Sequence, residues 1–145
     1  MPSMKQYAYP GFGENSRRSH WYSSAVRTGD QVHCAGQGGY ADASGKVPSD
    51  LVEQIDLAFA NVDKALKDAG SKGWSQVYRI NSYHIQLNEV AQNAMVRNFK
   101  KWMGESDNHP TWTCVQIGRL GQDDMLVEIE VSAFDPEGAK KEGTH

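Results

Sequence analysis

Two carboxylates lie two positions apart in the last strand that the sequence predicts, residues 125–134: Glu128 and Glu130. Side chains alternate between the two faces of a strand, so these carboxylates share one face. The opposite face is apolar and suits packing under helices; it carries Val127, Ile129, Val131 and Ala133. A partly buried carboxylate can orient or deprotonate a water molecule, which is the work of a general base. The alternation leaves a second interpretation open, in which both glutamates are ordinary solvated acids.

A second group of side chains that could do chemistry lies in the preceding predicted strand, residues 111–119. If the apolar Val115 and Ile117 face the helices, the opposite face holds a mixed set: Trp112, Cys114, Gln116 and Gly118. An indole, a thiol and an amide beside two carboxylates are typical of a wet subunit interface or a ligand cleft. The Cys114 thiol is equally compatible with a purely structural role.

The elements that would position these residues follow from the hydrophobic periodicity. Residues 51–69 and 89–103 predict amphipathic helices, because apolar side chains recur there every three or four positions. Ser49 or Asp50 is placed to cap the first turn of the first helix and Asn88 that of the second, and Gly70 is placed to end the first helix. The predicted strands are residues 21–27, 31–37, 77–87, 111–119 and 125–134. This order predicts an α+β fold, with a mainly antiparallel or mixed sheet, two helices packed on one face and the other face uncovered.

The length of 145 residues suits a single hydrophobic core. We interpret residues 1–20, which are broken by proline and glycine, as an N-terminal arm. Residues 21–135 form the predicted domain, and the charged residues 136–145 a flexible tail.

Composition argues against several classes of function. A net charge of −3 and a pI near 5.9 provide no basic surface for nucleic acid, so no nucleic-acid partner is expected. No apolar run approaches the roughly 20 residues that span a bilayer, and the N-terminus resembles no secretory signal. Together with two cysteines far apart in the sequence, this favours a cytoplasmic protein without a membrane partner. The five histidines form no metal-binding pair, and Gly36–Gly39 lacks phosphate-loop spacing, so neither a metal nor a cofactor is expected.

Seven short segments resemble the RidA/YjgF family in their order and spacing, over about residues 20–134. They are Ala35-Gly36-Gln37, Gly45-Lys46-Val47-Pro48, Gln54 through Asn61-Val62, His109-Pro110, Thr113-Cys114-Val115, Arg119-Leu120 and Val127-Glu128-Ile129-Glu130. The resemblance implies a chorismate-mutase-like fold and a homotrimer with ligand clefts between its subunits. It also implies hydrolysis of reactive 2-imino and 2-aminoacrylate species to 2-keto acids and ammonia.

Carried over by position, the resemblance implies catalytic roles for Glu128, which would position or activate water, and for Cys114. It implies substrate-binding roles for Tyr22, Gly36 and Gln37, and for Asn93 if one residue is skipped in the helix. Trp112 stands where the family has an arginine that binds the substrate carboxylate, and Gly121 stands where it has a proline. Losing such a two-pronged, charge-assisted contact costs on the order of 2–5 kcal/mol.

The sequence leaves open whether another arginine replaces the missing one; the candidates are Arg17, Arg18, Arg27 and Arg119. We expect a small planar ligand to stack on Trp112, with backbone groups at Gly36 or Cys114 holding a developing oxyanion. The expected reaction is hydrolysis of an imine, enamine or related electrophile, with general 2-imino acid deaminase activity weak or absent. One alternative is a trimer that binds small molecules, or acts like a chaperone, without catalysis. Another is an endoribonuclease, which suits an acidic chain poorly.

Overall fold

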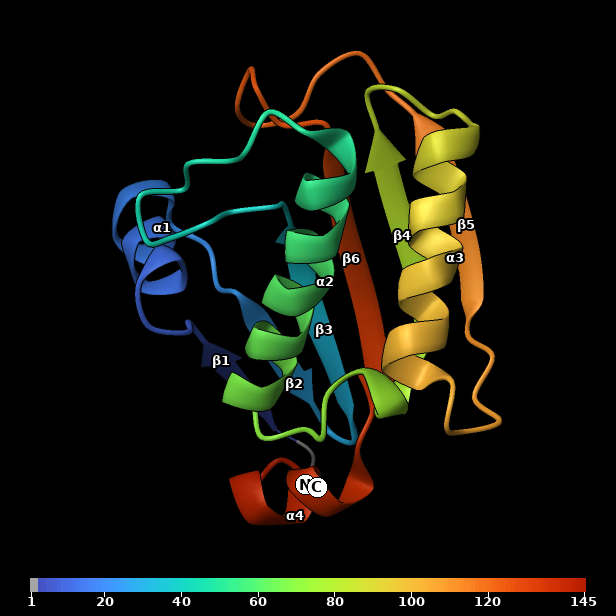
Figure 1. Ribbon diagram of the computed structural model, residues 1–145. Helices are drawn as coiled ribbons and strands as arrows, with labels where there is room; N and C mark the ends of the chain where they lie inside the picture. Colours follow the sequence, from blue (N-terminus) through green and yellow to red (C-terminus); the bar gives the residue numbers. More distant parts are fainter. Residues whose placement is uncertain (1–2) are drawn as a thin grey trace.

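The structure, a computed structural model, describes residues 3–145. Its centre is a six-stranded sheet with the order β1-β2-β3-β6-β4-β5 (Figure 1). The strands are β1 (Met4–Tyr7), β2 (Ala25–Thr28), β3 (Gln31–Gln37), β4 (Val77–His84), β5 (Thr111–Gln116) and β6 (Val127–Phe134). Neighbouring strands are antiparallel except for β4 and β5, which run parallel.

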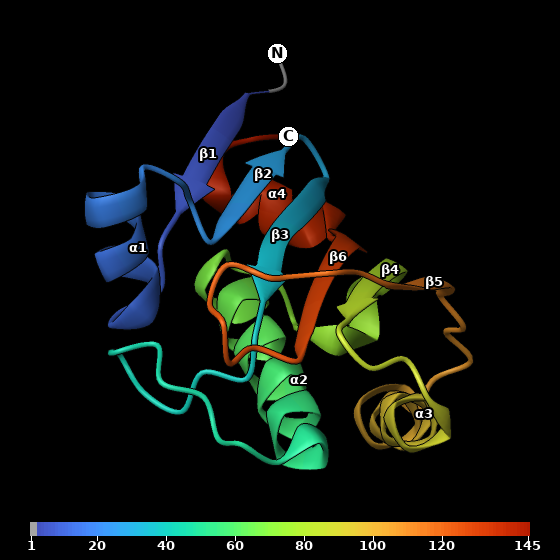
Figure 2. The same cartoon turned by 90° about the horizontal axis from the view of Figure 1, so that it is seen from above.

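Two long helices, α2 (Leu51–Asp68) and α3 (Glu89–Met103), cover one face of this sheet, as the sequence predicts. Figures 1 and 2 show both helices on the same side of the strands. The side chains of Asp50 and Asn88 cap them, each accepting a hydrogen bond from a backbone N–H of the first turn. The predicted α+β architecture is confirmed.

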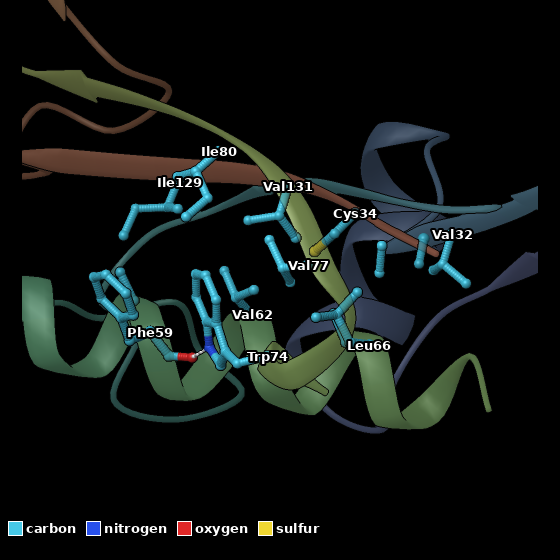
Figure 3. Packing of buried hydrophobic residues seen from close by; sticks show 14 of the residues in the cluster. Val32, Cys34, Phe59, Val62, Leu66, Trp74, Val77, Ile80, Ile129 and Val131 are labelled. Atoms are coloured by element: carbon cyan, nitrogen blue, oxygen red, sulfur yellow. Dashed lines mark hydrogen bonds between the residues drawn. The ribbon is translucent and has the colours of Figure 1, made fainter. Parts of the chain in front are cut away.

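The hydrophobic core lies between the two helices and the sheet (Figure 3). Phe59 of α2 stacks on Trp74 with ring centroids 4.7 Å apart. Trp74 belongs to the short 3-10 helix η1 (Trp74–Gln76), and its indole N–H donates to the Phe59 carbonyl at 2.9 Å. The only polar atom of the buried indole is therefore satisfied, and its burial costs little.

Several predicted strand ends differ from the structure. The hairpin between β2 and β3 turns at Gly29, whose φ of 55° lies in the left-handed region that glycine adopts readily. However, β2 begins at Ala25 rather than at residue 21, because Trp21 ends a preceding helix in the left-handed conformation. β4 and β5 also end three residues earlier than predicted.

The described part of residues 1–20, which the sequence analysis interprets as an N-terminal arm, contains regular structure. Those residues contain β1, which pairs antiparallel with β2, and α1 (Phe12–His20). The predicted tail likewise contains a helix, α4 (Pro136–Glu142). Both helices are poor in apolar side chains, since α1 has one large apolar residue, Phe12, and α4 has none. Both are held by contacts with residues distant in the sequence.

The strongest of these contacts is a buried ion pair between Arg27 of β2 and Asp135, the residue that caps α4. Their side chains are 2.8 Å apart and essentially inaccessible to solvent. Arg27 also donates to the carbonyl of Ala69, at the end of α2, at 2.8 Å. Burial alone would raise the pKa of Asp135, but hydrogen bonds from Arg27, the Gly138 N–H and Gln76 lower it. Arg27 is thus fixed inside its own chain.

Candidate functional site

The predicted division of β6 into two faces is confirmed. Its apolar face is buried under the helices and carries Val127, Ile129, Val131 and Ala133. Glu128 and Glu130 point to the uncovered face, opposite Tyr83 and Asn81 of β4. Tyr83 and Asn81 both donate hydrogen bonds to the Glu130 carboxylate. Glu130 is therefore held in a network, while no side chain among residues 3–145 donates a hydrogen bond to Glu128.

Glu128 borders a cavity of about 220 Å³ that also includes His20, Tyr22 and Tyr40. The Glu128 side chain lies against Gly36 of β3. A Cβ atom at position 36 would come within 2.6 Å of the Glu128 carboxyl carbon. The absence of a side chain at Gly36 is what allows the carboxylate to lie against β3. The structure therefore brings together Glu128, Tyr22 and Gly36, three of the residues that the sequence predicts as a site.

The protonation of Glu128 is perturbed by its surroundings. Burial raises the pKa of this carboxyl above its ordinary value, and the nearby charge of Glu130 raises it further. The neighbouring Tyr40 also has a raised pKa, first because of burial and then because of the Glu128 charge. A carboxyl group whose pKa is shifted toward neutrality is a better proton acceptor and donor near pH 7 than an exposed one.

The predicted orientation of Trp112 and Cys114 is wrong. In the parallel register of β4 and β5, Trp112 pairs with the buried Ile80, and Cys114 with the buried Ser82. Trp112 packs edge-on against Phe99 of α3, with centroids 5.0 Å apart. Its indole N–H donates to the Ser82 hydroxyl at 2.9 Å. Both residues therefore face the helices, on the side of the sheet opposite Glu128.

The orientation of β5 was mispredicted because β5 is an edge strand that carries apolar residues on both of its faces. Val115, predicted to be covered by the helices, is 40% exposed on the uncovered face. Ile117 lies beyond the end of β5 and packs against a second, smaller cluster. The larger indole packs against Phe99 on the side of α3, and the aliphatic Val115 side chain is left on the uncovered face.

The other predicted site residues lie apart from Glu128 within one chain. Gln37 is buried, accepts a hydrogen bond from the Tyr9 hydroxyl at 2.7 Å and donates to the Ala35 carbonyl. Asn93 lies on an exposed position of α3. Gln37 thus links the end of β3 to the segment between β1 and α1, and the side chain of Asn93 is exposed to solvent.

None of the four candidate arginines lines the Glu128 cavity. Arg27 forms a buried ion pair with Asp135 and donates a hydrogen bond to the Ala69 carbonyl, and Arg119 forms an exposed ion pair with Asp123. Arg17 and Arg18 lie in the exposed last turn of α1. His20 is the cavity residue that can carry a positive charge, and the sequence reasoning missed it because it did not predict α1.

Within residues 3–145, no group of three or more histidine, cysteine, aspartate or glutamate residues is arranged to hold a metal ion. The helices of that part of the chain are too short or too polar to cross a membrane.

Comparison with known proteins supports the family assignment. The family model described as Endoribonuclease L-PSP matches residues 14–134. The chain is 29% identical over 129 residues to the RutC family protein YjgH of Escherichia coli (strain K12), covering 89% of the chain and 94% of that protein. It is 32% identical over 116 residues to a RutC family protein of Haemophilus influenzae, and the match covers 77% of this chain and 85% of that protein.

A third relative, TdcF of Escherichia coli (strain K12), carries the provisional name reactive intermediate deaminase and is 29% identical over 114 residues, covering 78% of the chain and 84% of that protein. The solved structure of YjgH matches with a TM-score of 0.77 and 26% identity, over 92% of this chain and 97% of that one. The crystal structure of E. coli TdcF with bound serine matches with a TM-score of 0.68 and 27% identity. This match covers 78% of this chain and 87% of the TdcF chain. The chain therefore belongs to the Endoribonuclease L-PSP family, the RidA/YjgF family whose motifs its sequence resembles, and it has that family's chorismate-mutase-like fold.

Proposed function

We propose that this protein hydrolyses an imine, enamine or related electrophile, with Glu128 as the general base. The observation that carries the proposal is the Glu128 carboxyl, which has a raised pKa, borders a solvent-accessible cavity and is backed by a glycine. The provisional name of the relative TdcF supports the same class of reaction.

In the proposed reaction, Glu128 takes a proton from a water molecule as the water oxygen attacks the imine carbon, and the protonated Glu128 then gives this proton to the nitrogen, which forms a carbinolamine. The Glu128 carboxylate next takes the proton of the carbinolamine hydroxyl and passes it to the nitrogen as the C–N bond breaks, so that the carbonyl forms and ammonia leaves. One carboxyl can serve both steps, because burial and the Glu130 charge raise its pKa, which makes it a stronger base than an exposed carboxylate. Hydrogen-bond donors such as the hydroxyl of Tyr22 would orient the substrate.

We further propose that the working cleft forms between subunits of a homotrimer. The uncovered sheet face carries exposed apolar side chains, Val115 at 40% and Phe134 at 54%, next to the polar network around Glu130. Such a mixed surface is typical of a subunit interface. A neighbouring copy would then bring the edge formed by Asn93 and β5 to the Glu128 cavity and complete the cleft for a small planar ligand.

The missing arginine limits the substrate range in this proposal. Trp112 cannot hold a carboxylate, since its one N–H is already donated to Ser82. General 2-imino acid deaminase activity should consequently be weak or absent, and a substrate without the α-carboxylate should be preferred.

The proposed general base and substrate preference can be tested by steady-state hydrolysis of two substrates. One is 2-iminopropanoate, and the other is an aromatic imine that lacks a carboxylate. The aromatic imine should be turned over faster, and Glu128→Gln should abolish its turnover without unfolding the protein. Unchanged turnover in Glu128→Gln would refute the general base. Ligand binding without turnover in the wild type would instead favour a non-catalytic binding trimer.

A further inference from the structure

A second cavity, of about 420 Å³, lies between α3, residues 104–110 and β5. Its apolar walls come from three elements and consist of Ile80, Val96, Phe99, Met103 and Trp112. Protein interiors seldom leave voids much larger than a water molecule, whereas small-molecule pockets measure roughly 300–1,000 Å³. This space therefore has the size of a ligand site rather than of a packing defect.

The cavity is separate from the Glu128 site. Trp112 and Ile80 point to the helix-covered side of the sheet, and Glu128 points to the uncovered side. The two cavities share no lining residue. A ligand in the α3–β5 cavity would not contact the proposed general base of the same chain.

The walls of the α3–β5 cavity favour a ligand whose main part is apolar, and in particular an aromatic ring. The indole N–H of Trp112 is already donated to the Ser82 hydroxyl, so its ring offers the cavity only carbon surface. Phe99 meets Trp112 nearly at a right angle, with 78° between the ring planes. A third ring packed against two rings in this arrangement gains stacking and edge contacts beyond simple area burial.

The charge of the lining favours an anionic head group. Two lining side chains can be cationic, Lys100 and His109, and none is acidic. Glu105 and Asp107 belong to the same loop but do not line the cavity. Within residues 3–145, the Lys100 ammonium forms no ion pair. Its charge is thus free to meet a ligand.

We propose that the α3–β5 cavity binds a small carboxylic acid with an aromatic body. The body packs against Trp112 and Phe99, and Lys100 holds the carboxylate at the rim. The site does not depend on the hydrolytic function proposed above, because it uses neither Glu128 nor the uncovered sheet face.

Isothermal titration with two probes of equal size tests the site: 3-phenylpropanoate and the neutral 3-phenylpropan-1-ol. The carboxylate should bind the wild type about three- to tenfold more tightly than the alcohol, as a charge-assisted contact predicts. Lys100→Gln should remove this difference. Lys101→Gln, the matched control on the next residue of α3, should preserve it, since Lys101 lies over the Trp102 ring and does not line the cavity.

Two further variants locate the binding. Val96→Phe adds bulk at a partly exposed wall position and should weaken both probes at least fivefold while the circular dichroism spectrum stays unchanged. Glu128→Gln should leave both affinities unaltered, whatever its effect on hydrolysis. The proposal is overturned if the wild type binds the two probes equally or not at all, if Lys100→Gln and Lys101→Gln behave alike, or if only Glu128→Gln weakens binding.

Discussion

Replacing Gly36 by alanine should displace the proposed general base with little other change to the protein. The added Cβ would lie 2.6 Å from both Cδ and Oε1 of Glu128, whereas comfortable carbon contacts are about 3.5–4.0 Å. One partner must therefore move by about 1 Å. The φ of Gly36 is not in the left-handed region, so the alanine backbone itself is unstrained. The flexible Glu128 side chain, which faces an open cavity, is the partner that yields.

The expected costs can be estimated separately for stability and for catalysis. Overpacking costs about 1–3 kcal/mol, and the lower end applies here because a side chain rather than backbone gives way. A displacement of about 1 Å at a reacting group lowers turnover by as much as ~100-fold. Pushing the carboxyl toward solvent should also lower its raised pKa toward the ordinary value.

The assay combines thermal unfolding, hydrolysis rates and an NMR titration of carboxyl carbons in protein labelled at glutamate. Gly118→Ala is the matched control, since a Cβ there meets nothing within 4 Å. The reasoning is refuted if Gly36→Ala leaves both the Glu128 pKa and the turnover at wild-type values, or if Gly118→Ala produces equal losses.

Three other substitutions have defined outcomes. Arg27→Met should destabilise the fold by about 3–5 kcal/mol in urea unfolding, because Asp135 would keep a buried and uncompensated charge; Arg119→Met, at an exposed pair, should cost less than ~1 kcal/mol. Glu128→Gln should raise Tm by roughly 2–4 °C at pH 8, an effect on the order of 1 kcal/mol, and the gain should vanish at pH 4. The sign follows because a raised pKa means that the folded state binds the proton more tightly, so wild-type stability falls as pH rises through that pKa. Val115→Glu should convert the proposed trimer to monomer in light scattering, and a monomeric wild type would contradict the proposed assembly.

The periodic parts of the structure could be predicted from the sequence, because each carries its own local signal. α3 has the predicted bounds, since Asn88 caps it and its apolar face recurs at helical spacing. The faces of β6 were predictable for the same reason: only one of them is apolar. Glu128 could be found from this alternation, and its partner Gly36 from the family resemblance.

What could not be predicted depends on contacts between distant residues. α1 and α4 have too few large apolar side chains to reveal them, one in α1 and none in α4, and α4 is anchored through Arg27, more than 100 residues earlier. The orientation of β5 was missed because both of its faces carry large apolar side chains, so only packing against Phe99 decides between Trp112 and Val115. His20 and Tyr40 reach the Glu128 cavity from α1 and from a glycine-rich loop, which sequence periodicity does not place.

The position of β6 in the sheet has a consequence for how the chain folds as it is synthesised. Of the six strands of this sheet, β6 leaves the ribosome last, yet it lies between β3 and β4 and joins the two halves of the sheet. Until it arrives, β3 and β4 each expose an unpaired edge, and α2 and α3 have only part of the surface against which they pack. Productive folding of this sheet should therefore begin only after residue 134 has emerged, and a chain stalled before residue 127 should depend on chaperones to avoid aggregation.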